Sequence, residues 1–591
     1  MAWYDEAVFY HIYPLGLTGA PKENDYGEPQ HRLNDLIPWI KHIKDIGCNA
    51  IYIGPLFESV GHGYETTDYK KLDTRLGTNE DLTNYDKECH KQGVKVIFDG
   101  VFNHVGRDFF AFKDLQKNRE NSSYKDWFCN VNFSGNNEYN DGFSYENWGG
   151  YNLLVKLNQK NQAVIDYICD AIRYWVTEFD VDGIRLDAAD VLDFNYMKAL
   201  RQIANEVKPE FWLMGEVIHG DYIRWVNEGT LHSVTNYHLH KALYSGHNDH
   251  NYFEIAHTVK RLYEMGGNKP DGLKLYNFVD NHDVERIYTK LTNKAHFAPT
   301  HILLYTLPGI PSLYYGSEFG IEGKKEKWSD DSLRPALKLE DYKDAIETNN
   351  CTKIISALGK IRQSTKALSY GDFKELRLTN RQYAFSRNYN GISVVVAVNN
   401  DDNDCTLTLP AGNCLEYVGT LSGEKVKVNN GQITVNVKAN YGDIWVPTDM
   451  ADKNIEPVLM KKEKKDPKKK VIDKVIKDKE IKNKVATNKT IKNQKDKGEL
   501  TKNEIIKDES NELKEKIVIP GPKVKKVKKE EKKILEPKLV DKPYEEMTIE
   551  ELQCGILAKM AKNGPITEQM RKDIEENVYH NSLLNWIKSF R

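Results

Sequence analysis

The sequence predicts an α/β protein whose main part is a closed (β/α)8 barrel, the TIM barrel. Short apolar runs typical of strands alternate with amphipathic stretches typical of helices, which indicates a parallel sheet. No GxGxxG turn follows any of the strand-like runs. An open doubly wound sheet would be expected to bind its ligand at such a turn, so a closed barrel fits the first part of the chain better.

Seven runs have the length and composition of barrel strands. They are 7–13, 50–53, 94–99, 183–187, 211–216, 274–280 and 301–307. The stretches 36–46 and 164–179 carry apolar residues at helical spacing and are predicted to be helices of the outer ring. We therefore assign residues 1–104 and 157–370 to the two parts of the barrel.

Two segments depart from this alternation of strands and helices. Residues 105–156 are polar and rich in Asn, Gly and aromatics, which predicts a small insertion domain after the third strand. Residues 371–449 consist of alternating strand patterns separated by turns, and Asn430-Gly431 between two such patterns is a strong hairpin signal. This part is predicted to be a C-terminal all-β sandwich domain.

The remaining residues form a basic segment and a predicted helical hairpin. Residues 451–540 contain 29 Lys, no Arg and 17 acidic residues, a formal net charge of +12, whereas the whole chain carries −3. Such a segment buries too little apolar surface to fold, so 450–540 is predicted to be a disordered linker. In 541–591, a capping box from Thr548 to Glu551 opens one helix, Gly564-Pro565 ends it, and a second follows.

Composition also bears on compartment and partners. The eight cysteines contain no CxxC pair, which argues against a zinc site and a disulfide framework. The N-terminus lacks the features of a signal peptide, and no apolar run approaches the roughly 20 residues of a membrane span. We expect a cytoplasmic protein, although a secreted chain after signal removal would have the same features. The Lys-rich segment lacks the Arg and aromatics of specific nucleic-acid binding, which leaves a polyanion or protein partner for the tail.

Polar clusters follow four of the predicted strands, where apolar strands have no packing reason to end in charged residues. They are DGVFNH from Asp99, GIRLD up to Asp187, GEV around Glu216 and VDNHD up to Asp283. Because the carboxyl ends of all barrel strands meet on one face, the carboxylates of Asp187, Glu216 and Asp283 are predicted to share one cleft. Glycoside cleavage needs two carboxyl groups of different pKa, and Arg185 would keep Asp187 ionised.

These four motifs, in this order, resemble those of glycoside hydrolase family 13, the α-amylase family. GCNAIYIGPLFES, HGYETTDY, VKLNQKN and GIPSLYYGSE add further matches, and the resemblance covers about residues 1–448. It implies that Asp187 is the nucleophile, that Glu216 is the general acid and then the base, and that Asp283 holds the sugar hydroxyls. It also implies supporting roles: sugar hydrogen bonding by His104 and His282, orientation of Asp187 by Arg185, stacking by Tyr64, and structural support by Asp99 and Asn103.

The resemblance also bears on metal binding. Asn103 occupies a position that serves as a calcium ligand in some members of the family. The segment Asp187-Ala-Ala-Asp190 lacks the Lys-His pair that many calcium-dependent α-amylases have there. No cofactor is therefore expected to be required, and Asn103 is the one candidate calcium ligand. Trp148, in the insertion, is more typical of a core residue than of a sugar platform.

The expected function is hydrolysis of α-1,4-glucosidic bonds in maltodextrins or starch-type glucans, with retention, through a covalent glycosyl-Asp187 intermediate. A cyclomaltodextrinase or an exo-acting α-glucosidase with transglycosylation is the alternative. Glu65 stands where exo-acting relatives often have Asp, and VKLN resembles the motif of neopullulanases and cyclomaltodextrinases. A catalytically silent binding or scaffold protein is disfavoured, because all three carboxylates are present.

Overall fold

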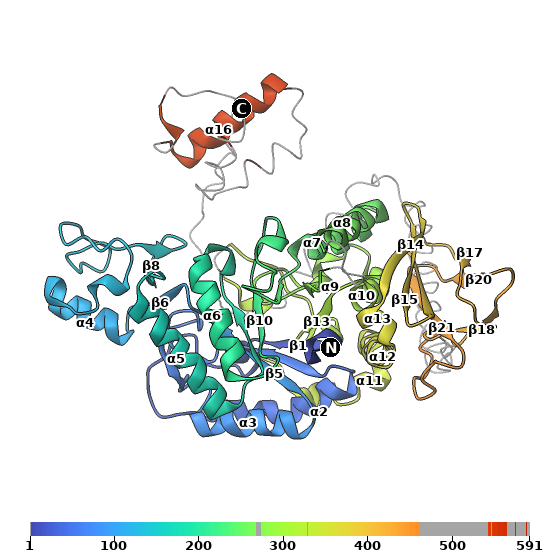
Figure 1. Cartoon of the computed structure of the whole chain (residues 1–591), viewed down its shortest axis with the longest axis horizontal. Helices are drawn as coiled ribbons and strands as arrows, with labels where there is room; N and C mark the ends of the chain where they lie inside the picture. The colour runs from blue at the N-terminus through green and yellow to red at the C-terminus, as the bar shows by residue number, and fades with distance from the viewer. Residues whose placement is uncertain are drawn as a thin grey trace, which may run out of the picture. The chain divides into compact units, whose positions relative to one another are not determined.

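The computed structural model describes residues 2–266, 273–327, 329–459, 542–544 and 547–563, together with Ile574 and Ile587. The chain divides into two compact units, residues 1–466 and 467–591. The first unit holds the barrel, the insertion and the C-terminal sheets, and Figure 1 shows the barrel strands surrounded by helices such as α2, α3, α5 and α6. Each unit is described by itself.

Eight parallel strands form the barrel sheet, in the order β11-β10-β9-β5-β2-β1-β13-β12. Their bounds are β1 Phe9–Ile12, β2 Ala50–Ile53, β5 Lys95–Gly100, β9 Gly183–Leu186, β10 Trp212–Gly215, β11 Ser233–Val234, β12 Tyr276–Asn277 and β13 Ile310–Tyr314. A bridge between Thr235 and Tyr276 joins the two ends of the sheet, and Asn236 N donates to Tyr276 O at 2.9 Å. The sheet thus closes, which confirms the predicted barrel.

Helices cover the outside of the barrel, and the predicted helices 36–46 and 164–179 correspond to α2 (Ile37–Asp45) and α5 (Gln162–Phe179). Side chains cap several helix starts: the Asp193 carboxylate, for example, accepts from two backbone N–H groups at the start of α6. The other helices of this part of the chain, outside the insertion, are α1 Pro14–Leu17, α3 Asn79–Lys91, α6 Phe194–Val207, α7 Tyr237–Asn248, α8 Tyr252–Met265, α9 Ile287–Lys290, α10 Phe297–Thr306, α11 Ala345–Thr348, α12 Asn350–Ser364 and α13 Lys366–Tyr370.

The predicted strand at 301–307 is wrong, because these residues belong to the end of α10 and the turn after it. Every residue of α10 is buried. A helix that is buried on all sides has no polar face, so its sequence shows the same continuous apolar run as a buried strand. The eighth strand is β13, a few residues further on. β11 was not predicted, because its two residues are too short to produce a pattern.

The insertion after the third barrel strand contains an antiparallel sheet in the order β6-β8-β7, together with one helix. The bounds are β6 His104–Gly106, α4 Phe110–Asn118, β7 Asn147–Trp148 and β8 Tyr151–Lys156. Its core is aromatic, with Phe112 of α4 packing on Phe128, Phe143 and Tyr145. A second antiparallel pair, β3 (Phe57–Ser59) and β4 (Thr66–Leu72), precedes α3.

The C-terminal part consists of two antiparallel sheets, which confirms the predicted all-β fold. The larger has the order β14-β15-β16-β21-β18-β19 and the smaller pairs β17 with β20. The bounds are β14 Asp372–Leu378, β15 Gln382–Tyr389, β16 Ile392–Asn399, β17 Cys405–Pro410, β18 Glu416–Gly419, β19 Lys425–Lys427, β20 Gln432–Val437 and β21 Tyr441–Pro447. Val395 and Trp445 of one sheet and Val435 of the other share a buried core.

The turn at Asn430-Gly431 is present, with φ of 50° and 72° at the two residues. Asn429 and Gln432 exchange backbone hydrogen bonds of 2.8 and 3.0 Å across it, as in a two-residue hairpin. The strands that it connects then separate, because β19 pairs with β18 and β20 pairs with β17. The turn therefore carries the chain from one sheet to the other.

The second unit contains helix α16 (Ile549–Asn563). The predicted capping box is confirmed: Thr548 N donates to Glu551 Oε2 at 2.7 Å, and Glu551 N donates to Thr548 Oγ1 at 3.3 Å. Apolar side chains of α16 form a small core with Ile574 and Ile587. The predicted linker from 460 onward and the rest of the second predicted helix lie outside the described residues. Within the described residues, no helix has the length and hydropathy that a membrane crossing requires.

Candidate active site

Arg185 of β9 lies at the centre of the polar cluster at the carboxyl ends of the strands. Its Nη1 donates to Asp99 Oδ1 at 2.8 Å and to Asp187 Oδ1 at 2.9 Å, and its Nη2 lies 2.8 Å from Glu216 Oε2. Arg185 is only 3 % exposed. Three neighbouring strands, β5, β9 and β10, thus bring three carboxylates to one buried guanidinium.

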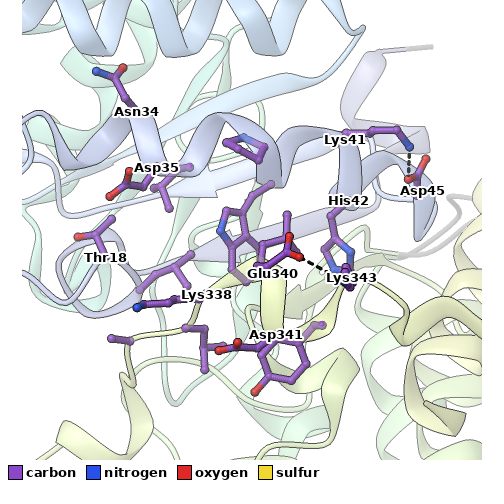
Figure 2. A pocket seen from close by; sticks show the side chains of 18 of the residues that line it. Thr18, Asn34, Asp35, Lys41, His42, Asp45, Lys338, Glu340, Asp341 and Lys343 are labelled. Atoms are coloured by element: carbon purple, nitrogen blue, oxygen red, sulfur yellow. Dashed lines mark hydrogen bonds and ion pairs between the residues drawn. The ribbon is translucent and has the colours of Figure 1, made fainter. Parts of the chain in front are cut away.

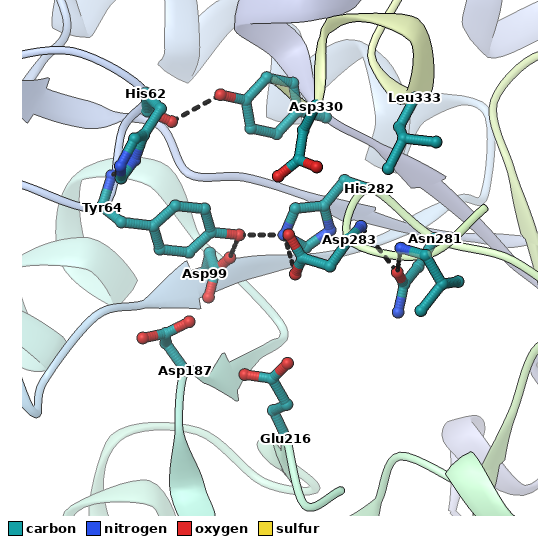
Figure 3. A network of polar contacts seen from close by, with 12 residues as sticks. His62, Tyr64, Asp99, Asp187, Glu216, Asn281, His282, Asp283, Asp330 and Leu333 are labelled. Carbon is teal, nitrogen blue, oxygen red and sulfur yellow. Dashed lines mark hydrogen bonds and ion pairs between the residues drawn. The ribbon is translucent and has the colours of Figure 1, made fainter. Parts of the chain in front are cut away.

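Glu216 is further held from β9 and from the start of α7. The backbone N of Ala188 donates to its Oε2 at 3.1 Å, and the hydroxyl of Tyr237 lies 3.4 Å from its Oε1. Figure 3 shows the carboxylates of Asp187 and Glu216 side by side, below Tyr64 and Asp283. The prediction that Asp187, Glu216 and Asp283 share one region is in agreement with this arrangement.

Asp283 lies in the loop after β12 and is held by Arg334 and His282. Arg334 Nη2 donates to its Oδ1 at 2.8 Å, and His282 Nε2 lies 3.0 Å from its Oδ2. Arg334 Nε also donates to the carbonyl oxygen of His282 at 2.9 Å. The backbone N of Asp283 donates to Asn281 Oδ1 at 2.8 Å, which fixes the turn that presents the carboxylate.

Tyr64 joins the two halves of the cluster. Its hydroxyl donates to Asp99 Oδ2 at 3.2 Å and also contacts His282 Nε2. Its ring lies nearly parallel to that of His282, with centroids 5.7 Å apart and an interplanar angle of 8°. Tyr52 of β2 donates to Asp99 Oδ2 at 2.7 Å. Asp99 therefore accepts hydrogen bonds from Arg185, Tyr52 and Tyr64, which agrees with its predicted role as structural support of the site.

His104 and Asn103 follow β5 and are both buried. His104 Nε2 has no hydrogen-bond partner among the described residues, so it is available to a ligand hydroxyl. The His104 ring lies parallel to Trp148, with centroids 6.4 Å apart and an interplanar angle of 10°. Trp148 is half-buried rather than part of the core, contrary to the interpretation from sequence.

The surroundings of Asn103 do not fit a calcium ion. Its Oδ1 accepts from Gln159 Nε2 at 3.0 Å, and its carbonyl oxygen accepts from Leu157 N at 3.0 Å. Calcium requires six to eight oxygen ligands, whereas both oxygens of this residue already accept N–H groups. Across the described residues, no group of three or more His, Cys, Asp or Glu side chains could hold a metal ion.

Burial and charge shift the pKa values of Asp187 and Asp283 in opposite directions. Burial raises the pKa of Asp187 well above its ordinary value; Arg185 opposes this, while Glu216 and Asp99 add to it. Arg185 acts on Asp187 in the expected direction, but this one guanidinium also contacts Asp99 and Glu216, so the pKa of Asp187 still lies above its ordinary value. Burial acts in the same direction on Asp283, but the charges of His282 and Arg334 hold its pKa well below its ordinary value.

This combination suits acid–base chemistry. Burial and the neighbouring carboxylates disfavour a full negative charge on Asp187, whereas Asp283 stays anionic and can bind hydroxyl groups or positive charge. Burial, and next to it the charge of His62, lowers the pKa of His104 to about 3. Because His104 Nδ1 accepts from Asn103 Nδ2 at 3.2 Å, the neutral ring carries its proton on Nε2, which can donate a hydrogen bond to a sugar hydroxyl.

Sequence reasoning missed Arg334, Tyr52 and Tyr237. Arg334 lies in a loop with no periodic pattern, and Tyr52 has the pattern of an ordinary residue in an apolar strand.

Glu65 stands at the position that bears on exo action in the sequence. Its side chain is 2 % exposed, and its oxygens contact Gly61 N at 3.4 Å and His62 Nε2 at 3.1 Å. Its carboxylate therefore binds its own loop.

A separate cavity of about 1100 Å³ lies between α2 and the segment 336–346 (Figure 2). Its lining includes Trp39, His42 and Lys338, with exposed carboxylates at Asp35 and Asp341. None of the three clustered carboxylates lines it. The cavity is therefore distinct from the candidate active site.

Comparison with known families identifies the family of the chain. The model of the alpha amylase catalytic domain matches residues 31–367, and that of the alpha-amylase C-terminal domain matches 371–445. The chain belongs to the alpha-amylase family. It is accordingly a glycoside hydrolase, and the resemblance stated from the motifs is confirmed.

Similar proteins of this alpha-amylase family include a cyclomaltodextrinase from Thermoanaerobacter pseudethanolicus, 33 % identical over 423 residues, which cover 67 % of this chain and 71 % of the relative. An intracellular maltogenic amylase from Bacillus subtilis is 29 % identical over 342 residues, or 55 % of this chain and 57 % of the relative. A solved cyclomaltodextrinase structure has a TM-score of 0.66 and 25 % identity, and the match covers 75 % of this chain and 78 % of that one.

Proposed function

We propose that this alpha-amylase family enzyme hydrolyses α-1,4-glucosidic bonds of maltodextrins with retention of configuration. The observation that carries the proposal is the shared contact of Arg185 with Asp187 and Glu216. This contact holds the carboxyl groups of Asp187 and Glu216, which follow neighbouring strands, side by side. In retaining enzymes the two catalytic carboxyl groups are about 5–5.5 Å apart.

In this proposal, Glu216 donates its proton to the glycosidic oxygen while Asp187 attacks the anomeric carbon. The C–O bond to the leaving sugar breaks and a glycosyl ester forms on Asp187. Glu216, now a carboxylate, removes a proton from water, which attacks the anomeric carbon and frees Asp187. Asp283 stabilises the positive charge that develops on the ring, and His104 and His282 hydrogen-bond its hydroxyls. Arg185, Asp99 and Tyr64 keep these groups in place.

The substrate proposal draws on the relatives, whose names are cyclomaltodextrinase and maltogenic amylase. A cyclomaltodextrinase activity, or exo cleavage with transglycosylation, is the alternative. The cyclic substrate is favoured over exo action, because the Glu65 carboxylate is bound within its own loop. A cytoplasmic location is proposed from the relative named intracellular. A polyanion or protein partner for the tail remains a proposal from its charge.

The deciding experiment is a time course of products from maltoheptaose, with starch and a cyclodextrin in parallel and Asp187→Ala as the control. Maltose and maltotriose with the α-anomer first, observed by proton NMR, are the expected products. Glucose alone at early times would indicate an α-glucosidase, and ring opening faster than starch cleavage would indicate a cyclomaltodextrinase. A β-anomer product would refute retention. Turnover equal to that of Asp187→Ala on all substrates would leave only a binding function.

A further inference from the structure

One strongly exposed aromatic residue lies in the insertion that follows the third barrel strand. Tyr151, at the start of β8, is 68 % exposed, more than any other aromatic among the described residues. It makes no ring contact or side-chain hydrogen bond with another described residue, unlike Tyr139 of the same insertion, which lies against Arg107. Single exposed rings are common on protein surfaces, so the position of Tyr151 in the insertion, rather than its exposure alone, bears on its role.

Hydrogen bonds and strand pairing fix the hairpin that carries Tyr151. Gly149 and Gly150 form its turn with φ of 64° and 84°, and Trp148 and Tyr151 are cross-strand partners on either side of it. Asn152, next to Tyr151, is fixed by hydrogen bonds: its carbonyl accepts from the Tyr145 hydroxyl at 2.7 Å, and its Oδ1 accepts from Asn147 Nδ2 at 2.7 Å. The exposure of Tyr151 is therefore not due to a loose chain.

The same hairpin reaches the candidate active site. β8 pairs with β6, in the register His104 opposite Lys156, and Trp148 lies parallel to the His104 ring. His104 of β6, Trp148 of β7 and Tyr151 of β8 thus belong to one small sheet, in which Trp148 lies next to His104 and pairs with Tyr151. No hydrogen bond or ring contact joins Tyr151 to Asp187, Glu216 or Asp283, within the part of the chain that the structure describes.

We propose that Tyr151 is the platform of a distal sugar subsite, on which a glucose unit beyond the cleaved bond stacks its apolar face. This rests on the proposed glucan hydrolysis and makes Tyr151 a determinant of chain length. An aromatic ring offers a flat apolar surface at a small cost in side-chain entropy, and the Tyr hydroxyl stays in water. Short substrates do not reach the subsite, whereas long ones gain binding from it.

The test compares kcat/KM on maltotriose and maltoheptaose for the wild type, Tyr151→Ala and Tyr151→Phe. Tyr151→Ala is expected to lose about tenfold on maltoheptaose and less than twofold on maltotriose, and Tyr151→Phe is expected to retain wild-type values, because the ring provides the contact. Phe253→Ala is the matched control, since Phe253 is 47 % exposed on α8 and has no ring contact with another described residue. It should leave both values unchanged.

The proposed subsite would be refuted if Tyr151→Ala lost kcat/KM equally on both substrates or on neither. It would also be refuted if Tyr151→Phe showed the same loss as Tyr151→Ala. Wild-type turnover of maltotriose reports separately on the proposed reaction. Binding of maltoheptaose to Glu216→Gln, with and without Tyr151→Ala, measures the subsite without turnover. A tenfold weaker affinity in the double variant would support the platform even if the bond cleaved were of another type, and equal affinities would exclude it.

Discussion

Arg334 Nη2 donates to Asp283 Oδ1 over 2.8 Å, from a loop 51 residues further along the chain. Together with His282, this contact holds the pKa of Asp283 below its ordinary value against the effect of burial. The anionic state of Asp283 thus depends on a residue that belongs to none of the recognised motifs. This relationship leads to the first prediction.

Replacement of Arg334 by Met should raise the pKa of Asp283, because burial then acts with less opposition. The acidic limb of the pH profile of kcat/KM is expected to move to higher pH. Loss of a charge-assisted hydrogen bond should lower kcat/KM by about 10- to 100-fold. Arg173→Met, which removes an exposed ion pair with Glu206, is the control. An unshifted acidic limb in Arg334→Met would contradict the role of Arg334.

Glu216→Gln should abolish turnover of maltodextrins while it preserves their binding. The amide keeps the shape of the carboxyl group but cannot donate its proton to the leaving oxygen, a step worth about 10²- to 10⁴-fold. Turnover of maltoheptaose and its affinity by calorimetry are the measurements. The exposed Glu80→Gln is the control. Near-normal turnover by Glu216→Gln would mean that another group is the acid.

Gly54→Ala should disturb the site through Asp99, which contacts Arg185. A Cβ at Gly54 would lie 2.3 Å from Asp99 Cβ and 3.0 Å from Asp99 N, so either strand must shift and the contacts of Asp99 with Arg185 are disturbed. We expect a loss of activity of at least tenfold and a decrease in the free energy of unfolding of about 1–3 kcal/mol. Gly229→Ala, where the nearest atom is 3.5 Å away, is the control for both. Full activity with normal urea unfolding would show that β5 accommodates the methyl group.

Stability should fall as the pH decreases below about 6.5. Burial lowers the pKa of His104, His240 and His247 to about 3, against about 6.5 in the unfolded chain. Between these values the unfolded chain binds more protons, so acid favours unfolding by about 1.4 kcal/mol per pH unit and histidine. Urea unfolding at pH 7 and pH 5 measures the change.

Replacement of one of these histidines tests its share in the pH dependence of stability. His240→Gln is expected to show a smaller decrease in the free energy of unfolding between pH 7 and pH 5 than the wild type. His257→Gln, at an exposed position of α8, should behave as the wild type. Identical pH dependence in His240→Gln and the wild type would mean that His240 is not protonated on unfolding.

The sequence predicted the barrel and the grouping of its carboxylates because both follow from strand ends. Asp99, Arg185 and Glu216 stand at or just after apolar strands that periodicity identifies. The carboxyl ends of barrel strands converge by geometry alone, so no further information was needed to bring these residues together.

Other features depend on contacts that no local pattern encodes. α10 has lost its polar face by burial, and β11 and β12 have two residues each. Arg334 reaches Asp283 only through the path of the loop after β13. The pKa of Asp187 depends on how many carboxylates share Arg185, which is a property of the assembled site rather than of the motif.

The closure of the barrel has a consequence for its dynamics. Between β11 and β12 the backbone pairs at the bridge from Thr235 to Tyr276 and through the N–H of Asn236, and the Asn236 side chain donates to Asn277 Oδ1 at 2.8 Å, whereas strands such as β1, β2 and β5 share longer ladders. Thermal opening should begin at this seam, where amide hydrogens will exchange earliest. Glu216 and Asp283 follow strands on opposite sides of it, so each opening event changes the width of the cleft between them.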